Sequence, residues 1–498
     1  MRNIAEGVYV GRVAPGLWVH TTTHRYPNGT LVPSNGMLLE SGEQSILIDT
    51  GSEEGHTSAL LGWAQRTLGK PVARVIVTHA HDDRTGGIGV LLERHIPVFG
   101  LPATRRLMVA AHRPAPEAIP VLEKRLWHDP AGFDVFFPGA GHAPDNVVVY
   151  FLHPRILFGG CLIKSATATT LGNVADADRS AWPGSIRRVA QTFSPPRLVI
   201  PGHGRAGGNA IGQTLHLLGA GTFDGLSDQM AQLAKAAHGR VGAAALLIET
   251  GESASLRGSE SFPMQSVYKA PISMAVLHEI EQGRLTLEQR VPVRKADLIA
   301  PGQYSPIATA YPKGGVALTV RELMQAALIE SDGTASDILL RLAGGPERVT
   351  GYLRAQDVRD LTVAASEKEM GRDDLLQYRS GATPEAAVQL LRLLATGRIL
   401  TPDHRRLLLD MMARAATGPH RIKGLLPAGT VVAHKTGTAG TRNGLTRATN
   451  DIGIVTLPDG RHLAIAVFVA DSRADTATRE GVIARIARAA WDRCVRKR

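Results

Sequence analysis

A short glycine-rich segment, residues 219–225, separates two halves of this chain that carry different residue patterns. It is followed by an amphipathic helical pattern over Leu226–Ala237, which is typical of the start of a new domain. The 498 residues are also too many for one ordinary domain. Twelve of the 18 histidines precede the second half, so the first half is expected to have a chemistry of its own. We predict two domains and a linker, with the bounds 1–219, 226–498 and 220–225.

The composition is that of a globular protein and excludes several classes of function. Hydrophobic residues make up 44% and charged residues 20% of the chain, which is enough for a large core. The net charge of +11 is spread over both halves as isolated arginines, and only 5% of residues are aromatic, so we predict no nucleic-acid binding. No apolar run approaches the roughly 18 residues that cross a bilayer. Two cysteines, Cys161 and Cys494, are too few for a disulfide framework.

The N-terminal residues do not form a secretory signal. Residues 1–20 have charges and glycines every few positions and lack the continuous apolar stretch of about 7–15 residues that a signal peptide contains. Two locations stay open: the cytoplasm, or the periplasm or exterior of the cell if a leader has been removed. The sequence does not determine the oligomeric state, and we expect a monomer.

Both halves are expected to be α/β domains. In the first half, strands alternate with helices, which predicts layers of sheet with helices outside: strands Gln44–Asp49, Arg74–Thr78, Val147–Leu152 and Arg155–Phe158, the last two as a hairpin, and helices Thr57–Leu68 and Ser185–Gln191. In the second half, a strand precedes a long helical middle and later strands return beside it: Gly242–Glu249, then about 266–415, then Val431–Lys435, Asp451–Leu457 and His462–Ala470, with a final helix at Thr476–Cys494.

Metal-binding side chains gather in turns of the first half. Strand Arg74–Thr78 runs into His79-Ala80-His81-Asp82-Asp83, where alternate residues point to one side. His79 and His81 can therefore converge on one ion while Asp83 reaches toward a neighbouring one. A lone His-x-His is a weak signal, and a lone buried cysteine is ordinarily a core residue. Three further donors in glycine-rich turns make the pattern specific and predict a zinc site: His142, Cys161 and His203.

Four segments of this half together resemble the B1 branch of the zinc metallo-β-lactamases: Thr78–Gly87, Gly139–Asn146, Phe158–Lys164 and Leu171–Asp178. The resemblance spans nearly all of residues 10–218 and implies an αββα sandwich. The glyoxalase and nuclease branches of the superfamily place a histidine ligand directly after the motif's aspartate, where this chain has Arg84. They also supply a bridging aspartate between the metals, where this chain has Cys161.

The resemblance implies two zinc ions and a hydrolytic role. One ion is expected on His79, His81 and His142, and the other on Asp83, Cys161 and His203, with open positions for water and substrate. Zinc lowers the pKa of bound water to about 7, so hydroxide would attack the lactam carbonyl. Two further residues resemble substrate-binding ones: Lys164 for the substrate carboxylate, with a plain surface charge as the alternative, and Asn173 for polarising the carbonyl.

A serine constellation occupies the second half. Ser266-Val267-Tyr268-Lys269 opens an apolar helical pattern, and at i and i+3 its serine and lysine share one face. Taken alone, this motif is very weak. Ser331-Asp332-Gly333 follows 65 residues later, and Lys435-Thr436-Gly437-Thr438 another 104 residues on, at the end of a predicted strand. Such a strand offers a cation and a hydroxyl for a carboxylate, and a backbone N–H for an oxyanion.

These three elements resemble the serine β-lactamase and penicillin-binding protein superfamily over about 226–494. The resemblance implies an antiparallel sheet with a helical subdomain. It also implies roles for the motif residues: Ser266 as nucleophile, Lys269 as proton acceptor, Ser331 as proton shuttle to the lactam nitrogen, Lys435 and Thr436 for the substrate carboxylate, and the backbone of Ser266 and of Gly437-Thr438 around the oxyanion.

A glutamate distinguishes the branches of this superfamily, because class A lactamases use one to activate deacylating water. Glu367 lies on an expected loop between the second and third motifs, with Glu369 as the second candidate and a solvated charge cluster as the alternative. The sequence leaves open whether Lys269 or Glu367 is the base of acylation. Gly333 and Gly371 depart from the class A pattern, which has asparagine at these two places.

We therefore expect a bifunctional β-lactamase, a hydrolase of cyclic amides that opens one ring by zinc chemistry and by a serine acyl-enzyme. The expected substrates are penicillins, cephalosporins and, for the zinc half, carbapenems. Two alternatives stay open for the second half: a penicillin-binding carboxypeptidase or transpeptidase, and a β-lactam sensor that stays acylated.

Overall fold

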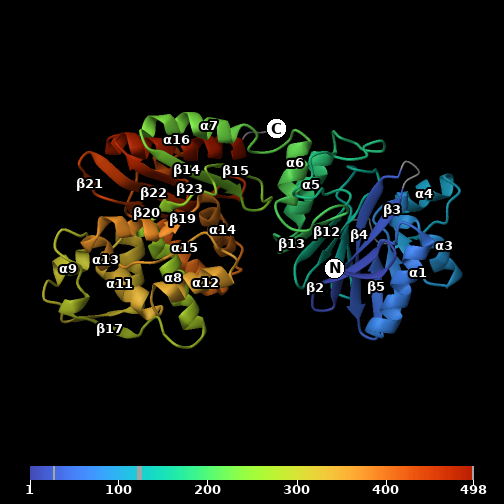
Figure 1. Ribbon diagram of the computed structural model, residues 1–498, viewed down its shortest axis with the longest axis horizontal. Helices are drawn as coiled ribbons and strands as arrows, with labels where there is room; N and C mark the ends of the chain where they lie inside the picture. Colours follow the sequence, from blue (N-terminus) through green and yellow to red (C-terminus); the bar gives the residue numbers. More distant parts are fainter. Residues whose placement is uncertain (26–28, 120–125, 496–498) are drawn as a thin grey trace. The chain divides into compact units, whose positions relative to one another are not determined.

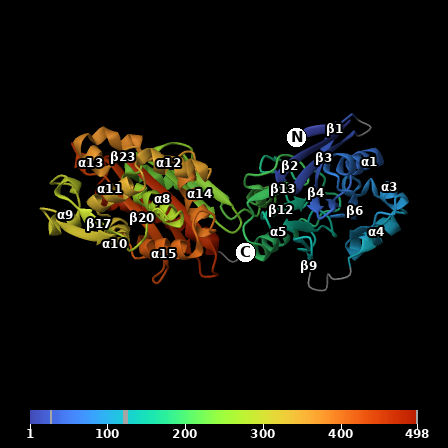
Figure 2. The same cartoon turned by 90° about the horizontal axis from the view of Figure 1, so that it is seen from below.

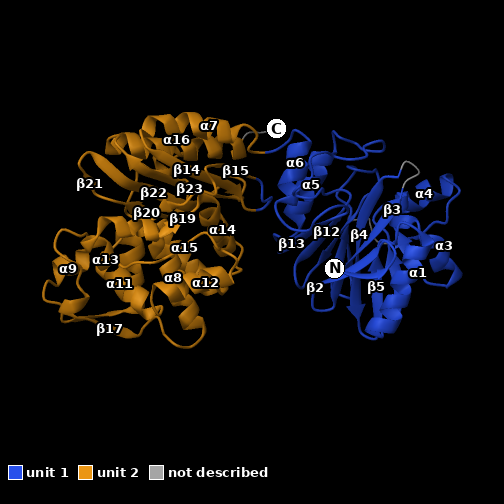
Figure 3. Cartoon of the chain, viewed as in Figure 1, with its two compact units in different colours: residues 1–221, 249–252 blue, residues 222–248, 253–498 orange. Residues whose placement is uncertain are grey.

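The computed structural model describes residues 1–25, 29–119 and 126–495. The chain divides into two compact units (Figure 3), with the bounds 1–221 plus 249–252 for unit 1, and 222–248 plus 253–498 for unit 2. Each unit has its own sheets and its own hydrophobic core.

Unit 1 contains two sheets that pack face to face. The first has eight strands in chain order, antiparallel up to β5 and parallel from β5 to β8: β1 Arg2–Ala5, β2 Val8–Ala14, β3 Leu17–Arg25, β4 Leu31–Ser41, β5 Gln44–Ile48, β6 Val72–Ile76, β7 Val98–Gly100 and β8 Glu117–Ala118. The second has the order β13-β12-β11-β10-β9: Leu198–Pro201, Ile156–Gly160, Val148–Phe151, Phe133–Phe136 and Leu126–Asp129. Met37, Ile48, Phe133 and Phe158 belong to the core between the sheets.

Helices cover the outer faces of both sheets of unit 1 (Figures 1 and 2). Buried residues of α1 and α3 pack on the first sheet and those of α5 and α6 on the second, which gives the expected αββα sandwich. The helices are α1 Glu54–Trp63, continued by a π-helical turn at Ala64–Leu68, then α2 Asp82–Thr85, α3 Ile88–Glu93, α4 Pro102–Ala110, α5 Trp182–Thr192 and α6 Ala210–Leu217. The predicted hairpin is confirmed, since β11 and β12 pair antiparallel.

Unit 2 is built on one antiparallel sheet of order β15-β14-β23-β22-β20. The strands are β14 Arg240–Leu247, β15 Ser253–Leu256, β20 Val432–Thr438, β22 Leu445–Thr456 and β23 His462–Ser472, with a short β21 at Thr441–Arg442 paired to β22. The last strand, β23, lies beside the first, β14, as the sequence predicts. Helices α7 (Leu226–Ala234) and α16 (Thr476–Val495) pack on one face of this sheet (Figure 1).

A helical subdomain packs on the other face of the sheet of unit 2. Its helices are α8 Lys269–Glu281, α9 Pro306–Ala310, α10 Val320–Gln325, α11 Gly333–Leu342, α12 Pro346–Ala355, α13 Glu367–Arg372, α14 Pro384–Ala395 and α15 Pro402–Ala413. The helical pattern did not reveal two short strand pairs beside these helices. β16 (Phe262–Pro263) pairs with β19 (Gly381–Ala382), and β17 (Arg290–Val293) pairs with β18 (Val316–Thr319).

The serine motif also differs from the predicted α-helix. Ser266 lies in a 3₁₀ turn, Gln265–Tyr268, and α8 begins only at Lys269. Pro271 supplies no N–H to the carbonyl four residues before it, so the first turn does not take α-helical hydrogen bonds there.

Within the described ranges, no helix combines the length and the apolar character needed to cross a membrane.

Replacing Phe468 by alanine is expected to destabilise unit 2 by about 3–5 kcal/mol, because it leaves a cavity in the core. The Phe468 ring is fully buried on β23 and stacks on Phe262 with a centroid distance of 6.0 Å. Calorimetry of the full chain measures the effect as a lowered temperature of one unfolding transition. Leu425→Ala, at a side chain that is 46% exposed, is the control. Equal shifts in the two variants would contradict this account of the core.

Candidate active sites

A buried carboxylate holds the turn that follows β6. Asp49, at the end of β5, accepts hydrogen bonds from Thr78 N at 2.7 Å and from Thr78 Oγ1 at 2.9 Å. Burial raises the pKa of Asp49 to about 7, against the opposing effect of the Arg84 guanidinium. These bonds fix the start of the segment that carries His79, His81 and Asp83.

Three histidine rings meet beyond this turn. His79 Nε2 lies 3.1 Å from His81 Nδ1, and the rings of His79, His81 and His142 have centroids 4.6–5.3 Å apart and steep interplanar angles of 73–88°. Their nitrogen atoms lie close enough together to hold one metal ion. Burial lowers the pKa of His79 to about 3 and that of His142 to about 4. Both rings are therefore neutral near pH 7, which is the form that binds zinc.

A second group of donors lies beside the first. His203 Nε2 is 3.1 Å from Asp83 Oδ2 and 3.2 Å from Cys161 Sγ, and the thiol is 3.7 Å from Asp83 Oδ2. Burial alone lowers the pKa of His203, but the neighbouring Cys161 and Asp83 raise it to about 10. The ring then carries a proton between two anions. A divalent cation satisfies the same two anions, so thiolate, carboxylate and imidazole fit a zinc ion at this place.

Arg84 is a residue of this site whose role the sequence did not reveal. It is completely buried, and its guanidinium lies 2.9 Å from Asp83 Oδ2 and donates to Cys161 Sγ at 3.0 Å and to Gly202 O at 2.9 Å. Burial alone raises the pKa of Cys161, but Arg84 brings it well below its usual range. The thiol is thus prepared as the thiolate that binds metal.

Asp176 is a second residue whose role the sequence did not reveal. Its carboxylate lies 2.9 Å from His81 Nε2, the ring nitrogen opposite the one that faces His79. A carboxylate on the far nitrogen fixes the tautomer and orientation of a metal-binding histidine. The segment Leu171–Asp178 contains Asn173 as its expected functional residue, and nothing in its sequence marks Asp176 as the partner of His81.

A pocket of about 550 Å³ opens on these donors and contains both expected substrate-binding residues. Lys164 is almost buried, and its ammonium lies 5.3 Å from the centroid of the Trp182 ring. Lys164 is therefore not a plain surface charge. Burial lowers the pKa of Lys164. Asn173 is exposed on the pocket rim, where its side-chain oxygen accepts a hydrogen bond from Ala175 N at 3.0 Å.

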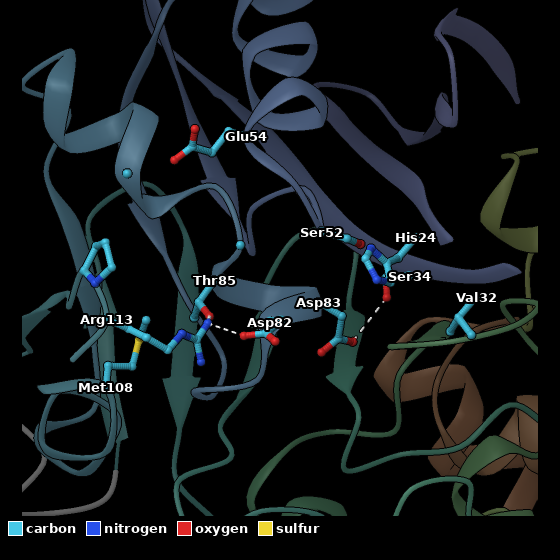
Figure 4. A pocket seen from close by; sticks show the side chains of 13 residues that line it. His24, Val32, Ser34, Ser52, Glu54, Asp82, Asp83, Thr85, Met108 and Arg113 are labelled. Atoms are coloured by element: carbon cyan, nitrogen blue, oxygen red, sulfur yellow. Dashed lines mark hydrogen bonds and ion pairs between the residues drawn. The ribbon is translucent and has the colours of Figure 1, made fainter. Parts of the chain in front are cut away.

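A smaller pocket of about 350 Å³ adjoins the donors on another side (Figure 4). Here Ser34 Oγ donates to Asp83 Oδ2 at 3.1 Å, and Arg113 pairs with Asp82 at 2.5 Å. The two neighbouring aspartates therefore have different partners. Arg113 holds Asp82, whereas Asp83 faces Cys161 and His203.

The serine motifs of unit 2 meet at one pocket of about 600 Å³, which Ser266, Lys269, Ser331 and Glu367 all line. Lys269 Nζ donates to Ser331 O at 2.7 Å and lies 3.5 Å from Ser331 Oγ and 3.0 Å from Glu367 Oε1. Ser331 has a left-handed φ of 64°, a strained conformation that occurs at functional sites. The structure thus brings Ser331 of the second motif and Glu367 into contact with the lysine of the first motif.

The third motif lies on β20, at the edge of the sheet, as predicted. Lys435 Nζ donates to Ser331 Oγ at 2.9 Å. Burial and the nearby Lys269 ammonium bring the pKa of Lys435 well below its usual range. Thr436 Oγ1 lies 2.5 Å from Thr417 Oγ1. Both threonines also line the pocket.

Arg421 is a further cation of this pocket that the motifs did not reveal. It is buried, and it donates to Thr438 Oγ1 at 2.8 Å and to Gly437 O at 3.2 Å. Its side chain therefore holds the end of β20 and adds a positive charge near Lys435.

The two candidate glutamates have different surroundings. Glu367 begins helix α13, rather than lying on a plain loop, and its carboxylate pairs with Lys269. Glu369 is exposed, and its carboxylate accepts hydrogen bonds from Ser366 N and Ser366 Oγ, both at 2.8 Å, which form a capping box with the N-cap Ser366 of α13. Glu367 therefore faces the serine pocket, and Glu369 stabilises the helix that presents it.

Gly333 packs closely against an apolar side chain, which an asparagine at this position would displace. A Cβ atom there would lie 2.7 Å from Ile299 Cδ1 and 3.2 Å from Tyr304 O. The neighbouring Asp332 is fully buried, and its carboxylate caps α11 and also accepts hydrogen bonds from Ser305 and Ile307.

Comparison with known proteins relates each half of the chain to a family of β-lactamases. A family model described as the metallo-beta-lactamase superfamily matches residues 29–203, and one described as the beta-lactamase enzyme family matches residues 225–494. The metallo-beta-lactamase type 2 of Bacillus sp. (strain 170) is 36% identical over 218 residues, which are 44% of this chain and 84% of that protein.

The second half has relatives of its own. The extended-spectrum beta-lactamase PER-1 of Pseudomonas aeruginosa is 42% identical over 232 residues, 47% of this chain and 75% of that protein. The crystal structure of a beta-lactamase from Chitinophaga pinensis DSM 2588 superposes with a TM-score of 0.53 at 42% identity, covering 54% of this chain and 99% of that one. The chain therefore belongs to both families: it is a zinc-binding metallo-β-lactamase followed by a class A serine β-lactamase, an enzyme that hydrolyses β-lactams.

Proposed function

We propose that each unit hydrolyses β-lactams by itself: unit 1 with two zinc ions, and unit 2 through an acyl-enzyme on Ser266. The proposed domains have the bounds 1–219 and 226–498, with a linker at 220–225. The observation that carries the proposal is the completeness of both groups of side chains in one chain, the six zinc donors and the Ser266–Lys269–Ser331–Glu367–Lys435 group. The proposed substrates are penicillins and cephalosporins for both units, and carbapenems for unit 1.

In unit 1, His79, His81 and His142 would hold one zinc ion and Asp83, Cys161 and His203 the other. Bound zinc supplies Lewis-acid polarisation and activates water at neutral pH. Lys164 binds the substrate carboxylate, and its position against Trp182 restricts where that carboxylate lies. Asn173 on the rim of the same pocket donates to the lactam carbonyl.

In unit 2, Ser266 Oγ attacks the lactam carbonyl carbon, and its proton passes to Lys269 or Glu367. The backbone N–H groups of Ser266 and Thr438 hold the oxyanion. Ser331 Oγ, which accepts a hydrogen bond from Lys435, gives its proton to the lactam nitrogen as the ring C–N bond breaks, and it takes a proton in return from Lys269, whose Nζ lies 3.5 Å away. The arriving carboxylate favours the charged form of Lys435, because an opposite charge raises a lysine pKa.

Glu367 then removes a proton from the water that attacks the acyl carbonyl, and Ser266 leaves as the alcohol. The ion pair with Lys269 and the position of Glu367 on the pocket wall support this role. A transpeptidase or a sensor needs no such base, so Glu367 favours a lactamase over both alternatives.

Removing zinc and removing the serine nucleophile are expected to abolish complementary parts of the activity. With a penicillin, wild type in EDTA and Ser266→Ala with zinc each retain turnover, whereas Ser266→Ala in EDTA does not. With a carbapenem, most turnover disappears in EDTA. Steady-state hydrolysis followed by absorbance measures all four conditions. If wild type in EDTA shows no penicillin turnover, unit 2 is not a working lactamase.

Glu367→Gln is expected to stop deacylation and to leave acylation measurable. In EDTA, the variant accumulates a penicilloyl adduct on Ser266, and steady-state kcat falls by about 10²-fold or more. Mass spectrometry of the intact chain, within minutes of adding a penicillin, measures the adduct. Glu369→Gln is the matched control and keeps turnover. A persistent adduct in the wild type would support the sensor instead.

Asp176→Ala is expected to weaken zinc binding by about 10-fold to 100-fold, since His81 loses the carboxylate that orients it. Competition with a chromophoric chelator measures the affinity directly. The Asp176 side chain is 60% exposed, so the variant is expected to fold. Asp176→Asn keeps a hydrogen-bond acceptor and should lose less affinity. Unchanged affinity in Asp176→Ala would refute a role for this residue in positioning His81.

A further inference from the structure

Gln303 occupies the space that a side chain at position 371 would fill. A Cβ atom on Gly371 would lie 2.5 Å from Gln303 Cδ and Nε2 and 2.7 Å from Oε1. The backbone of Gly371 is not in the left-handed region, so its conformation would accept a side chain. The group that takes this space is therefore an amide from another segment, and a side chain at position 371 would displace it.

The Gln303 amide is fixed by two hydrogen bonds. Nε2 donates to Glu367 O at 2.6 Å, and Oε1 accepts from Ala300 N at 3.1 Å. A primary amide has two N–H groups and two lone pairs on its oxygen, so one donor and one acceptor site remain after these bonds. Gln303, Glu367, Gly371 and Ser266 all line the serine pocket. The amide therefore has one N–H donor and one oxygen lone pair left for other partners, and its side chain lines the same pocket as Ser266.

The hydrogen bond from Gln303 to Glu367 O also helps to hold the first residue of α13 in place. The Asp337 carboxylate accepts hydrogen bonds from Glu367 N at 2.7 Å and from Lys368 N at 3.1 Å. Gln303 instead holds the carbonyl of Glu367. Both backbone groups of Glu367 are therefore tied to side chains from outside α13.

We propose that Gln303 is a positioning residue for deacylation in unit 2. Its amide takes the place of the side chain that Gly371 lacks. The proposal rests on the proposed role of Glu367. During deacylation, the water oxygen bonds to the acyl carbon and its proton goes to Glu367. The bond from the acyl carbon to Ser266 Oγ then breaks, and the proton returns to Ser266 Oγ. The Gln303 amide holds Glu367 in place and contacts the attacking water.

The test moves the amide from position 303 to position 371. Gln303→Ala removes it, and the double variant Gln303→Ala/Gly371→Asn returns an amide to the vacated space from position 371. All measurements use the full chain in EDTA, so that turnover comes from unit 2. A penicillin is the substrate, with kcat and KM from steady-state rates and the fraction of acylated Ser266 from mass spectrometry during turnover. Gln282→Ala, at an exposed position after α8, is the matched control.

We expect kcat and KM of Gln303→Ala to fall together by about 10-fold to 100-fold, because a misplaced base and water slow deacylation more than acylation, and deacylation then limits turnover. Acylated Ser266 then accumulates, and kcat/KM stays nearly constant. The double variant is expected to recover most of the lost kcat. Calorimetry distinguishes a slow variant from an unfolded one.

Three outcomes would overturn the proposal: unchanged kcat in Gln303→Ala, a loss of kcat/KM without an acyl adduct, or no recovery in the double variant. The result with Glu367→Gln distinguishes a failure of the role of Gln303 from a failure of the role of Glu367. If that variant traps the adduct and Gln303→Ala does not, only the role of Gln303 fails. If Glu367→Gln retains turnover, the proposed base itself is wrong.

Discussion

The buried guanidinium of Arg84 is the interaction on which the zinc half most depends. From the short helix α2 it reaches Asp49 after β5, Asn35 on β4, Cys161 after β12 and Gly202 after β13. It therefore joins a strand of the first sheet to segments that follow strands of both sheets. A charge with no exposed surface is tolerated only where its hydrogen bonds and counter-charges are satisfied, so these contacts also fix the loops that carry the metal donors. The same cation keeps Cys161 ionised while it neutralises part of the charge of Asp83.

The serine half also contains buried charged groups that need partners, and it arranges these partners differently. Two lysine ammonium groups, Lys269 and Lys435, share the hydroxyl of Ser331, and Glu367 supplies a carboxylate in direct contact with Lys269. Burial, and after it the charge of Lys269, bring the pKa of Lys435 well below its usual range. The pocket is therefore poised to exchange protons around Ser331, and it favours an anionic substrate that restores the balance of charge.

The sequence predicts much of this arrangement because its strongest patterns are local. His79 and His81 lie two residues apart after a strand, and Lys435 follows the apolar run of an edge strand, so alternation alone places them. Arg84, Asp176 and Arg421 were missed for the opposite reason. The bond of Arg84 to Gly202 joins residues 118 positions apart, and the bond of Asp176 to His81 joins residues 95 apart. No local pattern marks such partners. The 3₁₀ turn at Ser266 was missed because a helical apolar pattern does not distinguish its first turn from α-helix.

The two glycines that depart from the class A pattern show why a missing side chain cannot be interpreted from sequence alone. In the sequence, Gly333 and Gly371 both remove an amide from the serine site. In the structure they differ, because the space at Gly333 is taken by the apolar Ile299, whereas the space at Gly371 is taken by the amide of Gln303. An apolar neighbour donates no hydrogen bond, so Ile299 does not replace the amide of an asparagine. A polar neighbour can supply such a bond from another segment. The chemistry of a site therefore depends on which groups reach it in space, and a residue 68 positions away in the printed sequence can supply what a motif residue lacks.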